Sequence, residues 1–571
     1  MSESGGRQMQ LADSNHSLYV YVSSIAGFDP VRTVYLCAPG WAAADAASAE
    51  AFAAASGWTQ LCEAAGAVLV MPIVSEGWTN QDPTLIQRIY RESANSFKTR
   101  SGRAIWGRQG RLWCWETLLY LVGYEDGAAF AGRVLIRCPN VFAGAALING
   151  VADDFSDGDR ISDHWFVKTV SGGYQRINRE VPICLWLFGR RTEAVDRALR
   201  YFSFGLDSEE IEVEIRGVRG IKRASSNNPA WQVRFFEGDF VAAPMLAALI
   251  YQECFECVIR WKNGPDGMLT LADRRDDFYQ NPRFLKRAIE MNSFRYDYFV
   301  HLPSGLRPED VRGLPLVFTI HGRGEPAWLF TAKNGWDTLA DETREFVLVS
   351  PDSPGNIWFL ERDGEALCRI AEATIEEFGL DPERVFLTGF SNGGMIAREV
   401  GIRYPELFAG ISPWNAPKPD SIAMSREDRP IDSEGFSDAF QDILTEFLAK
   451  SVRLPAYYIF GDQDPAASPA QDLTLASLLR ANRCRLRSDP ATPTGYRPDS
   501  IDAGEVAYPG SDGYREGERM TTYCYCGEDG ETQVCVSLIR DLPHGAIHDE
   551  SRAAWNFLKR FRRIRTGEME A

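Results

Sequence analysis

One serine in this sequence stands where its hydroxyl could act as a nucleophile. Ser391 is the centre of Gly389-Phe-Ser-Asn-Gly393, a G-x-S-x-G pattern that follows a β-branched and aromatic segment and precedes residues with helical spacing. A strand that turns sharply into a helix strains the backbone of the central residue, and the flanking glycines leave room for that turn. Because the turn lifts the hydroxyl clear of the sheet, Ser391 is the predicted nucleophile; an ordinary tight turn is the alternative.

A serine hydroxyl needs a base that accepts its proton and an acid that orients the base. The chain order in this type of site is serine, acid, histidine, which leaves His544 and His548 as bases after Ser391. His544 directly follows a predicted strand, whereas His548 stands at the approach to a helix, so His544 is the predicted base. Asp464 and Asp462 both follow another predicted strand. Asp464 keeps the offset from the strand-end glycine expected of the acid, and Asp462 could instead stabilise the turn.

Negative charge on a carbonyl oxygen needs N–H donors that are already in place, usually one after the nucleophile and one from the loop after the first long strand. The predicted donors are the main-chain amides of Asn392 and Arg323, and a plain glycine turn is the alternative for the loop around Arg323. Aromatic side chains that follow strands could line a pocket, although core packing explains them equally well. The residues predicted for this substrate pocket are His321, Trp336, Trp358 and Trp414.

The elements that must position these residues occur twice. Residues 121–149 and 387–415 align without a gap and share 12 identities in 29 positions, where background composition would give about two. Strand patterns alternate with helical patterns in both halves, which indicates a mainly parallel sheet covered by helices on both faces. The sequence therefore predicts two domains of the α/β class, residues 1–260 and 293–571, joined by a polar linker at 261–292.

Several short motifs of the second half match a known family. They are His321-Gly-Arg-Gly324, Gly335-Trp336, Leu339-Ala-Asp341, Asp381-Pro-Glu-Arg-Val385, Gly389-Phe-Ser-Asn-Gly-Gly-Met395, Asn482-Arg-Cys484 and His544 with Ala554-Trp555. Through them, about residues 293–571 resemble the polyhydroxybutyrate depolymerase and feruloyl or acetylxylan esterase group of α/β-hydrolases. The resemblance implies that Ser391, Asp464 and His544 are nucleophile, acid and base. It also implies hydrolysis of a carboxylic ester through an acyl-enzyme, without a cofactor or a metal ion.

The first half carries the same pattern without the chemical groups. Glu125 stands at the position of Ser391 and Thr192 at that of Asp464, and no histidine follows the predicted strand 233–236. A carboxylate in that turn has no visible partner for catalysis. The sequence therefore predicts a degenerate α/β-hydrolase-like domain that packs on the second half as an intramolecular pseudo-dimer.

The composition and the net charge limit the classes of partner that this protein can bind. The 571 residues hold 61 Lys and Arg against 79 Asp and Glu, a formal net charge of −18, which repels nucleic acid and anionic membranes. No apolar run approaches the roughly 20 residues that span a bilayer, and the N-terminus is polar, so a cytoplasmic protein without a membrane partner is expected. Cys254 and Cys257 form a CxxC that lacks a second pair at suitable spacing, so no metal site is expected.

The predicted function is that of a serine esterase whose partner is a small-molecule or oligomeric ester. Two alternatives stay open. An amidase or peptidase would use the same three side chains, because they do not distinguish an ester from an amide. A non-catalytic binding or scaffolding protein would need none of them, so the presence of Ser391, Asp464 and His544 counts against it.

Overall fold

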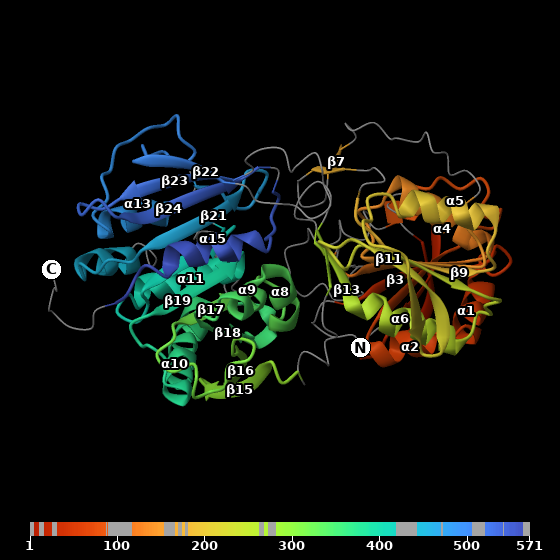
Figure 1. The fold of residues 1–571 in the computed structure, drawn as a ribbon, viewed down its shortest axis with the longest axis horizontal. Helices are drawn as coiled ribbons and strands as arrows, with labels where there is room; N and C mark the ends of the chain where they lie inside the picture. The colour runs from red at the N-terminus through yellow and green to blue at the C-terminus, as the bar shows by residue number, and fades with distance from the viewer. Residues whose placement is uncertain are drawn as a thin grey trace. The chain divides into compact units, whose positions relative to one another are not determined.

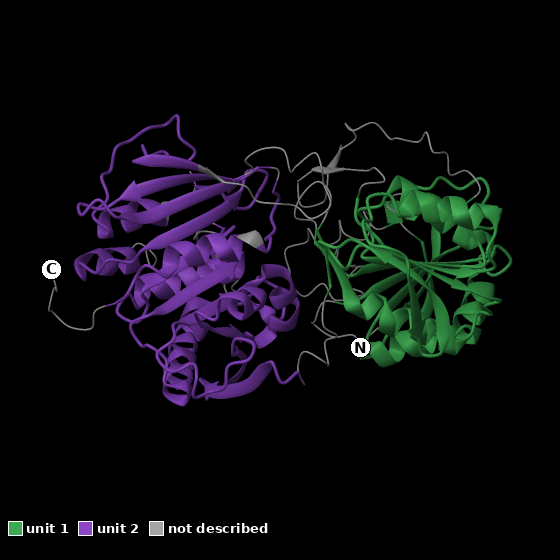
Figure 2. Ribbon diagram, in the orientation of Figure 1, with its two compact units in different colours: residues 1–170, 174–274, 508–513 green, residues 171–173, 275–507, 514–571 purple. Residues whose placement is uncertain are grey.

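The computed structural model divides into two compact units (Figure 2). Among the described residues, unit 1 comprises those up to 271 and unit 2 those from 281 onward. The described residues are 5–10, 16–25, 31–86, 88–89, 117–152, 166–168, 174–176, 181–261, 268–271, 281–417, 442–469, 472–504, 520–540 and 542–563. Of the predicted linker, residues 262–267 and 272–280 lie outside this description.

Unit 2 is built on one ten-stranded sheet (Figure 1). Its strand order is β15-β16-β18-β17-β19-β20-β21-β24-β23-β22. The strands are β15 (Phe284–Met291), β16 (Phe294–His301), β17 (Leu316–Ile320), β18 (Val347–Pro351), β19 (Val385–Phe390), β20 (Gly410–Trp414), β21 (Ala456–Gly461), β22 (Ser500–Gly504), β23 (Met520–Cys526) and β24 (Thr532–Ile539). Neighbours from β18 to β24 pair in parallel, and two antiparallel strands extend the sheet at each end.

Burial explains which strands were easy to predict. Every residue of β17 and β19 is buried, as expected of parallel strands that are covered on both faces and read as apolar runs. Strand β15 alternates between more and less exposed residues, because one face of this edge strand meets solvent. Its polar side chains, such as Lys286 and Glu290, give it the composition of a linker, yet it pairs along its whole length with β16. The first described strand of unit 2 therefore lies inside the stretch 261–292 that was predicted as linker.

Helices cover both faces of this sheet. They are α8 (Ala327–Asn334), α9 (Trp336–Thr343), α10 (Leu360–Phe378), α11 (Asn392–Arg403), α13 (Leu473–Ala481) and α15 (Asp549–Leu558). The chain moves from β17 to β18 in one direction across the sheet and from β18 to β19 in the other. Right-handed crossovers in opposite directions place their helices on opposite faces. Accordingly, α9 packs against α15 and α10 packs against α11.

Unit 1 has the same topology. Its sheet has the order β1-β2-β4-β3-β5-β6-β9-β12-β11-β10, which matches unit 2 strand for strand. The strands are β1 (Gly5–Gln10), β2 (Ser17–Val22), β3 (Thr33–Cys37), β4 (Val68–Pro72), β5 (Leu119–Tyr124), β6 (Gly144–Ile148), β9 (Cys184–Gly189), β10 (Ile211–Ile215), β11 (Val218–Ala224) and β12 (Gln232–Glu237). The helices are α1 (Ala46–Ala55), α2 (Trp58–Ala65), α4 (Asp126–Arg137), α5 (Glu193–Phe202) and α6 (Pro244–Glu253). Two small sheets pair β7 (Phe166–Lys168) with β8 (Tyr174–Arg176) and β13 (Val258–Trp261) with β14 (Met268–Leu271). The predicted two-domain α/β fold is confirmed.

Candidate active site

Ser391 lies in a strained turn between β19 and α11. Its backbone angles are φ 55° and ψ −119°, a conformation that costs roughly 1–3 kcal/mol for a residue with a side chain and persists only when the surroundings impose it. The surroundings here are strand ends. Its N–H donates to Trp414 O at 2.9 Å, and a Cβ on Gly393 would lie 2.1 Å from Ile320 O. The turn therefore needs a glycine at 393, because the helix starts directly against the end of β17.

The structure brings the three predicted side chains together. His544 Nε2 lies 2.8 Å from Ser391 Oγ, and His544 Nδ1 lies 2.8 Å from Asp464 Oδ2. The Asp464 side chain is fully buried, and its other oxygen accepts the main-chain N–H groups of Ala466 at 2.7 Å and Ala467 at 3.3 Å. An ionised carboxylate only accepts hydrogen bonds, so Nδ1 is the protonated nitrogen. This arrangement leaves the Nε2 lone pair directed at the serine hydroxyl.

The two alternative residues take other positions. Asp462 is exposed, and its main-chain N–H donates to Ile539 O at 3.0 Å. His548 Nε2 lies 3.0 Å from Ala332 O, to which it can only donate. The geometry therefore favours Asp464 over Asp462 and His544 over His548.

Asn415 connects the loops that carry the acid and the base. Its Oδ1 accepts the N–H of Gly461, the last residue of β21, at 2.7 Å. Its Nδ2 donates to Gly545 O, directly after His544. The residue also has a positive φ of 41°. No sequence motif predicts this role of Asn415, although its identity with Asn149 in the repeat is a signal for it.

Asn392 occupies the first position of α11, where main-chain N–H groups lack an acceptor within the helix. Its side chain binds the backbone of Trp358 in both directions. Oδ1 accepts Trp358 N–H at 2.7 Å, and Nδ2 donates to Trp358 O at 3.1 Å. Arg323 lies in the loop after β17, where Gly324 N–H donates to Asn356 O at 2.6 Å. Both predicted donor amides thus belong to segments that hydrogen bonds hold in place. These segments lie on either side of the strained turn at Ser391, which we call the elbow.

The predicted pocket residues lie beneath the site. His321, Trp336, Trp358 and Trp414 are each at most 1% exposed, so they offer no surface to a substrate in this conformation. Burial lowers the pKa of His321 to about 4. The neutral ring donates from Nδ1 to Gly322 O at 2.8 Å and accepts Ser353 N–H at Nε2 at 3.2 Å. His321, which was predicted to line the substrate pocket, therefore holds the loop in place instead.

A buried ion pair supports the same loop. Lys333 Nζ on α8 lies 2.9 Å from Glu325 Oε1, with side chains 3% and 6% exposed. Glu325 Oε2 accepts Gly322 N–H at 3.3 Å. Lys333 Nζ also lies 3.6 Å from the ring centroid of Phe390, whose ring packs on His544 at 5.0 Å. No local sequence motif predicts this ion pair, because its role depends on contacts that form only in the folded chain.

Unit 1 has the same elbow with different chemistry. Glu125 has φ 54° and ψ −122°, nearly the angles of Ser391. Gly40 is the third residue after β3, as Arg323 is after β17. The N–H of Gly40 donates to Asp126 Oδ1 at 2.8 Å. The Asp126 carboxylate thus already binds the Gly40 amide. This amide corresponds to that of Arg323, a predicted oxyanion donor.

The other two positions of unit 1 also carry different groups. Thr192, predicted at the place of Asp464, caps α5 by accepting Val195 N–H at 3.2 Å. Asn149 Nδ2 donates to Phe240 O, as Asn415 does to the residue after His544. This correspondence places Asp239 where unit 2 has its histidine, and Asp239 pairs with an arginine at the surface.

Neither metal ligands nor membrane spans emerge from the described segments. No group of three or more His, Cys, Asp or Glu side chains could hold a metal ion there. None of the helices in the described ranges is long and apolar enough to cross a bilayer.

The strand order and the strained serine turn define an α/β-hydrolase fold. No family model matches the chain. The chain is 28% identical over 139 residues to the bifunctional acetylxylan esterase/xylanase XynS20E of Neocallimastix patriciarum, which covers 24% of this chain and 20% of that protein. It is 31% identical over 128 residues to poly(3-hydroxyalkanoate) depolymerase C of Paucimonas lemoignei, covering 20% of this chain and 30% of the relative.

An acetyl xylan esterase structure from Aspergillus awamori is also similar, with 16% identity, 48% of this chain and 99% of that chain covered and a TM-score of 0.36. The matched segments span less than a third of the length of each of the two curated relatives named above. The matched segments are thus similar to parts of an acetylxylan esterase/xylanase and of a poly(3-hydroxyalkanoate) depolymerase.

Proposed function

We propose that this protein hydrolyses carboxylic esters and that Ser391, His544 and Asp464 carry the reaction. The observation that supports this most directly is the His544 ring, which lies 2.8 Å from both the serine oxygen and the carboxylate. The curated relatives add support, because their names describe an acetylxylan esterase/xylanase and a poly(3-hydroxyalkanoate) depolymerase. An ester with a short acyl group is therefore the substrate class to test first.

The reaction follows from the proton positions. Ser391 Oγ bonds to the acyl carbon while its proton passes to His544 Nε2, and Asp464 stabilises the imidazolium through Nδ1–H. The carbonyl oxygen becomes an oxyanion, which the amides of Arg323 and Asn392 stabilise. The ester C–O bond then breaks, and Nε2 gives its proton to the leaving alcohol. Water loses a proton to the same Nε2 as it attacks the acyl-enzyme, and the acid leaves as the proton returns to Oγ.

Labelling with a fluorophosphonate probe and turnover of p-nitrophenyl acetate test this proposal together. We expect Ser391→Ala and His544→Ala to abolish both, because nucleophile and base act as a unit. His548→Ala is the matched control, since this histidine contacts a carbonyl on α8 instead, and it should keep most of the activity. Residual turnover in Ser391→Ala above about a thousandth of wild type would indicate another nucleophile.

An amidase or peptidase would pass the same test. Turnover of p-nitroacetanilide, which presents the same acyl group on an amide, separates the two activities. We expect the ester to be hydrolysed and the anilide not to be measurably hydrolysed. A comparable kcat/KM on both compounds would replace the esterase assignment by an amidase.

A further inference from the structure

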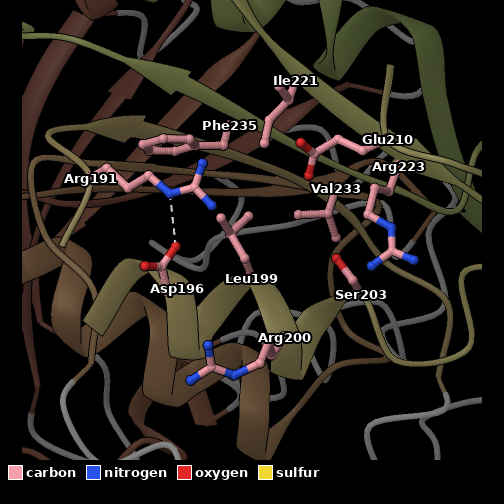
Figure 3. Close-up of a pocket in the computed structure, with 10 residues that line it drawn as sticks. All are labelled: Arg191, Asp196, Leu199, Arg200, Ser203, Glu210, Ile221, Arg223, Val233 and Phe235. Atoms are coloured by element: carbon pink, nitrogen blue, oxygen red, sulfur yellow. Dashed lines mark hydrogen bonds and ion pairs between the residues drawn. The ribbon is translucent and has the colours of Figure 1, made fainter. Parts of the chain in front are cut away.

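Unit 1 contains a cavity that plays no part in the elbow. It has a volume of about 160 Å³ and lies between α5 and the strands β11 and β12 (Figure 3). Its apolar lining consists of Leu199, Ile221, Val233 and Phe235. A cavity of about 150 Å³ lined by apolar side chains accommodates one benzene ring. The space therefore fits a group the size of one aromatic ring or a short branched chain.

The remaining lining is charged. Arg191, Arg200 and Arg223 contribute three positive charges against those of Asp196 and Glu210, a local balance of 3 − 2 = +1 in a chain whose net charge is −18. Arg191 and Arg223 stand on opposite sides of the apolar lining in Figure 3. Arg191 Nε is paired with Asp196 Oδ1 at 2.9 Å. The excess positive charge is thus one unit, which suits a monoanion better than a dianion.

Arg223 indicates where the anion would sit. Its Nε is buried and has no hydrogen-bond partner in the structure. This atom has almost no accessible surface, so a ligand in the cavity would meet the two terminal nitrogens of the guanidinium, which lines the cavity. These two nitrogens also present N–H bonds in parallel, the geometry that matches the two oxygens of a carboxylate.

We propose that this cavity binds a small monocarboxylate with one apolar ring or short chain. The carboxylate pairs with Arg223, and the apolar group lies against Leu199 and Val233. The acidic side chains Asp196 and Glu210 at the same cavity disfavour phosphate, which carries more negative charge at neutral pH. This site is independent of Ser391 and of the esterase proposal.

Calorimetric titration of the full-length protein with benzoate tests the site. We expect saturable binding that is at least tenfold weaker in Arg223→Gln. Arg219→Gln is the matched control, because Arg219 is on the same strand but its side chain is 87% exposed and pairs with Glu214. Benzyl alcohol, which lacks the charge, and inorganic phosphate, which lacks the ring, should not saturate at the same concentrations.

Three outcomes would overturn the proposal: no saturable binding of benzoate, equal binding to wild type and Arg223→Gln, or phosphate binding as tight as that of benzoate. The second outcome would also reveal benzoate that binds near Ser391 instead. Leu199→Trp supplies a second variant should Arg223→Gln fail to fold, because the larger ring fills the cavity and leaves every arginine in place. It should abolish binding, and unchanged affinity in Leu199→Trp would count equally against the site.

Discussion

The residue that follows the elbow is Asn392 in unit 2 and Asp126 in unit 1. This difference changes which backbone groups the side chain binds. In unit 2 the carboxamide of Asn392 accepts and donates, so both of its ends bind the backbone of Trp358. In unit 1 the carboxylate of Asp126 can only accept, and it binds the N–H of Gly40. The side chain in unit 2 therefore binds the backbone of Trp358, whereas its counterpart in unit 1 binds the amide that corresponds to that of Arg323.

Asn392→Asp should transfer the arrangement of unit 1 to unit 2. We expect kcat to fall by roughly 10²–10³, the usual effect of losing one oxyanion donor, with a smaller change in KM. Steady-state kinetics on p-nitrophenyl acetate measures this, and the rate of fluorophosphonate labelling should fall in parallel. Asn482→Asp, in a buried asparagine at the end of α13, is the control for a general loss of packing. Unchanged kcat in Asn392→Asp would contradict the assignment of the oxyanion donors.

At the scale of elements, α8 stabilises the loop after β17 through Lys333 and Glu325. Removing one partner of a buried ion pair typically costs 3–5 kcal/mol, because the other charge stays buried alone. We therefore expect Lys333→Met to lower the free energy of unfolding of unit 2 by about 3 kcal/mol. Lys333→Met with Glu325→Gln should recover more than half of this loss, since a glutamine oxygen can still accept the N–H of Gly322. Loss of probe labelling in urea reports the unfolding of unit 2, and equal destabilisation by both variants would contradict the role of the pair.

His321 makes this loop sensitive to acid. The unfolded chain binds a proton at its ring below pH 6.5, the ordinary value, whereas the folded protein does so only below its lowered pKa of about 4. Between these values the unfolded state holds more protons, so the free energy of unfolding falls as the pH falls, by up to about 1.4 kcal/mol per pH unit from this residue. The contribution is fully present above pH 6.5 and is lost towards pH 4.

His321→Asn should remove this dependence. The variant is expected to be less stable than wild type at pH 7, because two buried hydrogen bonds are altered. The difference should shrink by about 3 kcal/mol on going to pH 4. Urea denaturation at half-unit intervals of pH measures it. A constant difference over the whole range would mean that the ring is not held neutral by burial.

At the scale of the whole molecule, the sequence predicted the topology shared by the internal repeat and the residues that stand in local motifs. The shared residues of 121–149 and 387–415 indicated one topology used twice, and the strand orders agree. Ser391 and His544 could be predicted because each stands in a local motif after a strand. Strand β15 was missed because its exposed face is polar. Lys333 was missed because its partners, apart from Glu325, are recognisable only once the chain has folded.

The contribution of the first half stays a prediction that a truncated chain can test. The sequence motifs alone would place the cut at the end of the predicted linker, but β15 begins at Phe284, so the fragment should start at 281. We expect residues 281–571 to aggregate or to show a raised KM relative to the full chain, if the first half supports the second as a pseudo-dimer. A soluble fragment with full activity would show that residues 1–260 are dispensable.

Glu125→Ala in the full chain completes this test. Glu125 is exposed, and the Gly40 amide, which corresponds to that of Arg323, already donates to Asp126. Neither the hydrolysis rate nor the probe labelling should change. A large loss of either would mean that the first elbow takes part in the reaction.

The position of β24 has a consequence for the order in which the protein is made. This strand follows the other described strands of unit 2 in the chain, yet it lies between β21 and β23 inside the sheet, and His544 follows it, 153 residues after Ser391. A chain interrupted before residue 532 leaves β21 as an open edge, which is a site for aggregation, and carries a serine without its base. Synthesis therefore passes through a stage in which the sheet has an exposed edge and the proposed nucleophile Ser391 does not yet have its proposed base.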